Sequence, residues 1–113
     1  MEDCIFCKLG SGQIPTNFVF ECEEFFIIKD IHPVAPIHYL AIPKQHYARL
    51  EGATDGMVAI QKIFQKLAEI KDDLGLQDGY RIIINQGANS HQEVQHLHIH
   101  ILGGKDLGSK IVA

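Results

Sequence analysis

Hydrophobic and polar residues alternate strictly in residues 94–104, where histidine occupies three successive polar positions. The three histidines are His96, His98 and His100, and they alternate with Leu97, Ile99 and Ile101. Successive side chains of an extended chain point to opposite faces, so the pattern predicts a β-strand. All three imidazoles should share one face of this strand, while the aliphatic side chains enter a core. The glycine pair that follows predicts the end of the strand.

One longer segment, from Thr54 to Leu74, has the three- and four-residue spacing of an amphipathic helix. Thr54 is a candidate N-cap, with Asp55 in the first turn, and Gly75 stands where a C′ glycine belongs. The apolar stripe, which we expect to face the core, consists of Ile60, Ile63, Phe64, Leu67, Ile70 and Leu74.

Four further short runs are rich in β-branched and aromatic residues and predict strands. They cover residues 18–21, 25–29, 38–43 and 79–85. Strands that gather around one helix, rather than alternating with helices, predict an α+β fold with an antiparallel sheet. The length of 113 residues fits a single domain, 1–113. The polar loop 86–93 leads directly into the histidine strand and, beside imidazoles, predicts an anion pocket.

Composition and charge exclude several classes of partner. The formal net charge of −4 gives no basic surface for a nucleic acid polymer, and no apolar run approaches the roughly 20 residues of a membrane span. The amino terminus has acids where a signal peptide would carry bases, so we expect a cytoplasmic protein. Three cysteines, an odd number, argue against a disulfide framework.

Cys4 and Cys7 form a C-x-x-C pair, which supplies half of a tetrahedral zinc site or a redox pair. A redox motif should follow a strand and open a helix, but almost nothing precedes Cys4. We therefore favour zinc, completed by histidines from elsewhere in the chain. Cys22 lies in an apolar run and is predicted to be a small core residue.

Three histidines on one face need an explanation, because they repel one another when charged and are costly to bury when neutral. The residues alone leave two functions open. One is a metal site built on His-x-His; the other is imidazole as nucleophile, base or phosphate ligand. A neutral imidazole is a competent nucleophile near pH 7. No Walker A or G-x-G-x-x-G sequence is present, so a nucleotide would be held differently.

The segment 96–102 resembles the histidine triad (HIT) motif, and further blocks extend the resemblance over nearly the whole chain. These blocks are residues 30–38, 41–44, 79–81, 85 and 102–104. The chain is most similar to the Hint branch of purine nucleoside phosphoramidases. The resemblance implies a HIT-like fold, a five-stranded antiparallel sheet with one long and one short helix on one side, and a homodimer. It also implies a purine nucleotide as ligand.

The resemblance further implies hydrolysis of purine nucleoside 5′-phosphoramidates, such as adenosine phosphoramidates, to a nucleoside monophosphate and an amine, with no cofactor required for catalysis. His98 would be the nucleophile and form a nucleotidyl-histidine, and His100 would bind or protonate around the phosphate. The main chain of His96 would orient His98, and His38 would lie near the nucleophile. The nucleotide site would also include Asp30 at the ribose, Phe6 and Ile31 at the base, and the loop residues Asn85, Gln92, Glu93 and Val94.

A zinc-binding subset of the family has ligands that correspond to Cys4, Cys7, His46 and His96, a Cys₂His₂ set for a structural zinc. The competing interpretation is that the two cysteines are simply buried thiols. Three alternative functions remain beside the phosphoramidase. They are a dinucleoside polyphosphate hydrolase, a non-catalytic module that binds a nucleotide or a partner, and a metal enzyme that uses all three triad histidines.

Overall fold

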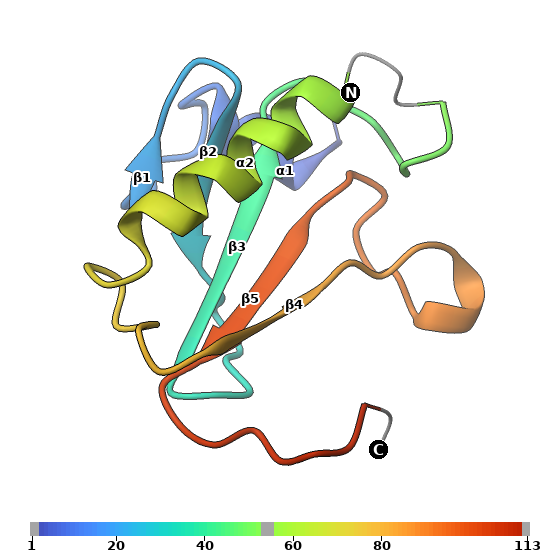
Figure 1. The fold of residues 1–113 in the computed structure, drawn as a ribbon. Coiled ribbons are helices and arrows are strands. Elements are labelled where there is room, and N and C mark those ends of the chain that lie inside the picture. The colour runs from blue at the N-terminus through green and yellow to red at the C-terminus, as the bar shows by residue number, and fades with distance from the viewer. Residues whose placement is uncertain (1–2, 53–55, 112–113) are drawn as a thin grey trace.

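The computed structural model describes residues 3–52 and 56–111 and contains one five-stranded antiparallel sheet with strand order β1-β2-β3-β5-β4 (Figure 1). The strands are β1 (Phe20–Glu21), β2 (Phe25–Lys29), β3 (Ile37–Pro43), β4 (Tyr80–Ile83) and β5 (Ile99–Gly103). The described helices are α1 (Ile5–Gly10), α2 (Gly56–Ile70) and the short 3-10 helix η1 (Ala88–Ser90). These elements confirm the predicted α+β class with five strands, one long helix and one short helix.

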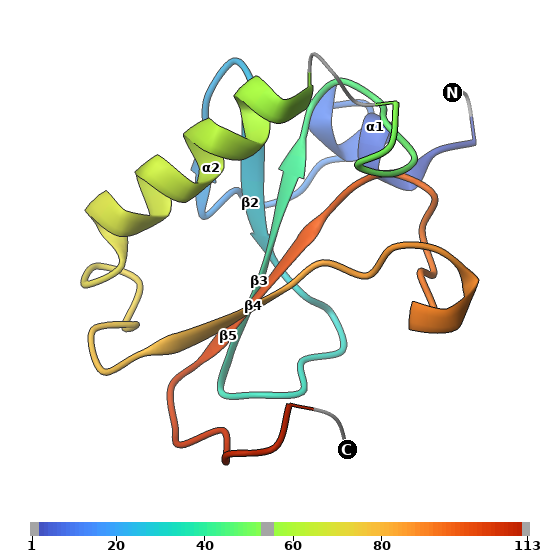
Figure 2. The same cartoon turned by 45° about the vertical axis from the view of Figure 1, so that its right-hand side comes forward.

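The sheet is covered on both faces, because β2 and β3 are apolar on both sides. In β2, Phe25 and Ile27 pack in the cluster that includes α2, whereas Phe26 and Ile28 pack with Phe6 of α1. Figure 2 shows α2 and α1 on opposite sides of β3. The expectation that both helices lie on one side is therefore wrong. α1 brings its cysteines to the face that carries the histidines.

The histidine strand is shorter than predicted, and β5 begins only at Ile99. Continuing the β3–β5 register would pair Leu97 with Pro43, which has no N–H to donate to the ladder. The N–H of Leu97 instead donates to the carbonyl of Tyr47 at 2.6 Å. The alternation still holds, because Leu97, Ile99 and Ile101 all lie in the core cluster beneath α2. His96 and His98 both contact Phe6 on the opposite face.

α2 differs from its predicted bounds and burial. The predicted cap residues Thr54 and Asp55 lie outside the described residues. The helix ends at Ile70 and is followed by turns. The last residue of these turns is Gly75, which has a left-handed backbone (φ 79°). Phe64, predicted to face the core, is 41% exposed, because it lies beside the stripe in which Ile63 is fully buried. No described helix is long and apolar enough to cross a membrane.

Candidate functional site

His98 lies just before β5 and is held in one tautomer by the backbone. Its Nδ1–H donates to the carbonyl oxygen of His96 at 2.7 Å. A carbonyl can only accept, so the proton of the neutral ring is on Nδ1 and the lone pair is on Nε2. The side chain is only 6% exposed and packs edge-on against Phe6, with ring centroids 5.1 Å apart. In His98, Nδ1 is therefore held by the backbone, and Nε2 carries a lone pair that can act as a nucleophile.

His100 lies next to His98, with ring centroids 5.1 Å apart, and connects to residues far away in the chain. Its Nδ1 is 2.9 Å from Nε2 of His38 on β3, and the same His38 nitrogen is 3.3 Å from Oδ2 of Asp30. Nδ1 of His38 accepts a hydrogen bond from the backbone N–H of Val34 at 3.2 Å. The structure thus brings together Asp30, His38, His98 and His100, four of the residues that the family resemblance placed in the site.

The surroundings of His100 favour its neutral form. Burial lowers the pKa of His100 below its usual 6.5, and the charges of His98 and His38 act in the same direction. The carboxylates of Asp30 and Glu93 oppose this shift. The Glu93 side chain is exposed.

The loop 86–93 is shaped by Gln92, whose buried side chain bonds to three backbone groups of the described residues. Its Nε2 donates to the carbonyls of Ala48 (2.7 Å) and Val94 (3.1 Å), and its Oε1 accepts from the N–H of Gly87 at 3.0 Å. Gln92 is therefore engaged in holding the loop. Among the other predicted nucleotide residues, Asn85 and Val94 are half-buried, and Ile31 is almost fully exposed.

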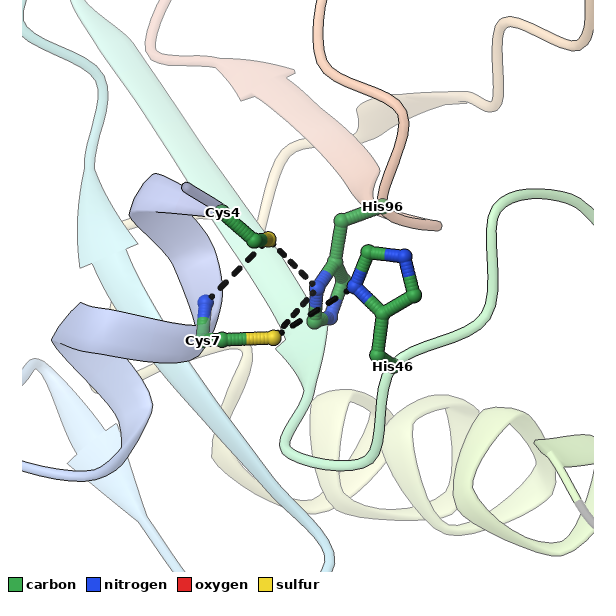
Figure 3. A group of neighbouring side chains, drawn as sticks. All are labelled: Cys4, Cys7, His46 and His96. Atoms are coloured by element: carbon green, nitrogen blue, oxygen red, sulfur yellow. Dashed lines mark hydrogen bonds between the residues drawn. The ribbon is translucent and has the colours of Figure 1, made fainter. Parts of the chain in front are cut away.

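Cys4, Cys7, His46 and His96 converge at the start of α1, with their ligand atoms all within 4.8 Å of one another (Figure 3). Sγ of Cys4 is 3.3 Å from Nδ1 of His96, and Sγ of Cys7 is 3.4 Å from Nδ1 of His46. Nε2–H of His96 donates to the carbonyl of Pro43 at 2.7 Å, so Nδ1 carries the lone pair that faces the thiols.

This geometry fits a tetrahedral zinc ion. Zn–S bonds of about 2.3 Å and Zn–N bonds of about 2.0 Å at tetrahedral angles separate sulfur from nitrogen by roughly 3.5 Å. Three of the four S···N pairs in the cluster are 3.3, 3.4 and 3.5 Å apart, close to that value. The pKa of Cys7 is raised to about 11, chiefly by burial. The hydrogen bond with Cys4 and the charge of Cys4 act in the same direction. A bound cation would reverse this preference for the neutral thiol.

An open cavity of about 760 Å³ borders this cluster and the loop before β5. Its lining residues are Asp3, Cys4, Ile5, His46, Glu93, Val94 and Gln95. Cys22 is separate from the cluster: it is half-buried at the edge of the core, and its thiol lies 3.5 Å from the carboxylate of Glu24.

Residues 11–107 match the HIT domain family. The chain belongs to this family. Among curated proteins, HitA of Neisseria gonorrhoeae is 44% identical over 104 residues, which cover 91% of this chain and 97% of HitA. Among solved structures, the HIT family hydrolase of Clostridium thermocellum is 39% identical and superposes with a TM-score of 0.91 over 99% of both chains.

Two further HIT structures bear on the ligands. The histidine triad nucleotide-binding protein of Candida albicans is 33% identical, with a TM-score of 0.84 over 98% of this chain and 84% of its own. A Zn-bound histidine triad family protein of Mycobacterium smegmatis is 31% identical, with a TM-score of 0.79 over 94% of this chain and 78% of its own.

Sequence reasoning missed two groups that shape this HIT site, the N–H of Val34 and the carbonyl of Pro43. Both are backbone groups that fix the tautomer of a histidine, His38 and His96 respectively. Every residue has such groups, so no side-chain pattern in the sequence identifies the ones that matter.

Proposed function

We propose that the chain is a nucleotide-binding hydrolase that cleaves purine nucleoside 5′-phosphoramidates to a nucleoside monophosphate and an amine. The observation that carries this proposal is the fixed tautomer of His98, which leaves Nε2 unprotonated on a ring that packs against the ring of His100. A similar structure described as a HIT family hydrolase and another described as nucleotide-binding support it.

In the first step the lone pair on Nε2 of His98 attacks the α-phosphorus. A P–Nε2 bond forms, the bond between phosphorus and the amine breaks, and the amine leaves with the bonding electron pair. The developing positive charge on the ring is stabilised by the hydrogen bond from Nδ1–H to the carbonyl of His96, which is 2.7 Å long. His100 donates a hydrogen bond to a phosphoryl oxygen.

The departing amine needs a proton from a general acid, and Glu93 is the candidate on the loop beside His100. In the second step water attacks phosphorus, the P–Nε2 bond breaks, and the acid regains its proton from that water. His98 returns to its starting form. A Glu93→Gln variant tests this assignment, because its kcat should fall most for substrates whose amine is a poor leaving group.

Intact mass spectrometry after brief incubation with an adenosine phosphoramidate tests the central step. The wild type should show a transient adenylyl adduct while AMP appears, and His98→Asn should fold but show neither. His32→Ala is the control, because His32 has an exposed side chain. Equal slow AMP release from the wild type and His98→Asn, without an adduct, would instead indicate a binding module. Preferential cleavage of a dinucleoside polyphosphate would identify the other family activity.

We further propose a structural zinc ion at Cys4, Cys7, His46 and His96. Four protein ligands would leave no open position for a substrate, so the zinc would tie α1 to the loops after β3 and before β5. We also propose a cytoplasmic location, where a reducing environment keeps Cys4 and Cys7 available as zinc ligands.

A homodimer is also part of this proposal, and the uncovered part of the sheet supports it. β4 is an edge strand, and Ile82 pairs with Ile101, so both side chains are on the face that α2 covers. Nevertheless Ile82 is 37% exposed, and Phe64 on α2 is exposed as well. A second copy would cover them. Sedimentation equilibrium should give a dimer for the wild type and a monomer for Ile82→Glu; a wild-type monomer would overturn this part.

A further inference from the structure

His38 links a backbone donor on one side to two acceptors on the other. The N–H of Val34 donates to Nδ1 of His38 at 3.2 Å. Because an N–H cannot accept, Nδ1 is unprotonated, and the neutral ring must carry its hydrogen on Nε2. His38 is 7% exposed, so water cannot readily replace these partners. The loop before β3 thereby sets the tautomer of His38.

Nε2–H of His38 faces Nδ1 of His100 at 2.9 Å and Oδ2 of Asp30 at 3.3 Å. The donor requires Nδ1 of His100 to accept, which puts the hydrogen of neutral His100 on its Nε2. The other oxygen of Asp30, Oδ1, accepts from the N–H of His32 at 2.8 Å, so the carboxylate is itself oriented. The result is a continuous chain of hydrogen bonds from the N–H of Val34 through His38 to His100. It leaves Nε2–H of His100 to donate to a ligand.

The same three side chains also lie close enough to hold a cation. A metal would need the lone pair of His38 on Nε2, whereas the N–H of Val34 keeps the hydrogen there. To bind a metal through Nε2, His38 would have to move its hydrogen to Nδ1, and the N–H of Val34 would then lose its acceptor. The geometry favours a hydrogen-bond chain over a metal site.

We propose that Asp30 and His38 are positioning residues that fix His100 as an Nε2–H donor to the phosphoryl group. This inference rests on the proposed function and assigns Asp30 a role that does not depend on the ribose. Neither residue needs to touch the phosphorus. Asp30 orients His38 through its carboxylate, and His38 orients His100.

The first test is ¹⁵N NMR of histidine-labelled protein at neutral pH, which reports each ring tautomer without turnover. The wild type should show the hydrogen on Nε2 in both His38 and His100. His38→Gln keeps an N–H donor near the position of Nε2, whereas His38→Leu removes it. His100 should stay in the Nε2–H form in the Gln variant and become mixed in the Leu variant. An Nδ1–H form of His100 in the wild type would overturn the proposal.

Kinetics provide the second test. His38→Leu should lower kcat roughly 10- to 100-fold with little change in KM, and His38→Gln should recover most of the loss. Substitutions of the buried His38 can disturb folding, so a second variant that leaves His38 in place is needed. Val34→Pro removes the N–H that donates to His38. Its rate is compared with Val34→Ala, which keeps the N–H; the Val34 side chain is 72% exposed and contributes little packing. Equal kcat in all these variants would overturn the proposal.

Asp30→Asn separates positioning from ribose recognition. A 2′,3′-dideoxyadenosine phosphoramidate lacks the hydroxyls that Asp30 would bind. Positioning predicts that Asp30→Asn still lowers kcat roughly tenfold or more on this substrate. An effect confined to the ribose substrate would leave Asp30 as a ribose ligand only and overturn its positioning role. Absence of turnover and adduct in the wild type would instead be a failure of the proposed function, a distinct result.

Discussion

Zinc binding should stabilise the chain through one identifiable cluster, and Cys7→Ser should abolish that effect. Cys7 is 3.4 Å from His46 and 3.5 Å from His96, so its thiolate would contact the ion together with both histidines. Cys22→Ser is the matched control, because its thiol lies by Glu24, outside the cluster. Serine is similar in size to cysteine but is a poor zinc ligand.

The magnitude follows from mass action. At free zinc 100-fold above its dissociation constant, stabilisation is about 2.7 kcal/mol. For 113 residues, an unfolding entropy of about 2.1 cal/mol/K per residue makes each kcal/mol worth about 4 °C. Zinc should therefore raise the Tm of the chelator-treated wild type by about 11 °C.

Differential scanning calorimetry with and without zinc measures this shift, and native mass spectrometry measures the zinc content. We expect one zinc per chain in the wild type and in Cys22→Ser, and no bound zinc and no shift in Cys7→Ser. The same shift in Cys7→Ser as in the wild type would refute the four-ligand site. So would a wild-type Tm that does not respond to zinc.

Three further predictions concern the scaffold of the site. Leu97→Ala should cost about 2–5 kcal/mol in a denaturant titration because the side chain is fully buried, whereas Gln95→Ala, two residues earlier and exposed, should cost far less; equal costs would contradict the burial of Leu97 in the core. Gly104→Ala should cost more than Gly108→Ala: both have positive φ (89° and 82°), but only at Gly104 would a Cβ meet Pro36, at 3.0 Å. In chelator-treated protein, burial lowers the pKa of His96 from 6.5 to about 4, so the unfolded chain takes up this proton first. Stability should therefore fall as the pH drops from about 6.5 to about 4, by at most roughly 3.4 kcal/mol. A Tm that stays constant across this range would contradict that account.

The pattern of residues determined which side chains face which way around the site. Strict alternation from Leu97 to Ile101 requires the aliphatic side chains to share one face, and this holds even where the segment is not paired as a strand. The spacing likewise identified the buried stripe of α2 at Ile60, Ile63 and Leu67, but Phe64 is exposed and the predicted Leu74 lies beyond the end of the helix. Such local periodicities are visible in a sequence because they depend only on the backbone repeat of a single element.

Only the tertiary structure decided which distant groups meet. Cys4 and His96 are 92 positions apart, and His38 and His100 are 62 apart, yet each pair is in contact. The β3–β5 register, in which His38 pairs with Leu102, determines the second contact. A one-residue slip would place these side chains on opposite faces. The register depends on contacts between elements, and so do the strand end beside Pro43 and the N–H that fixes His38.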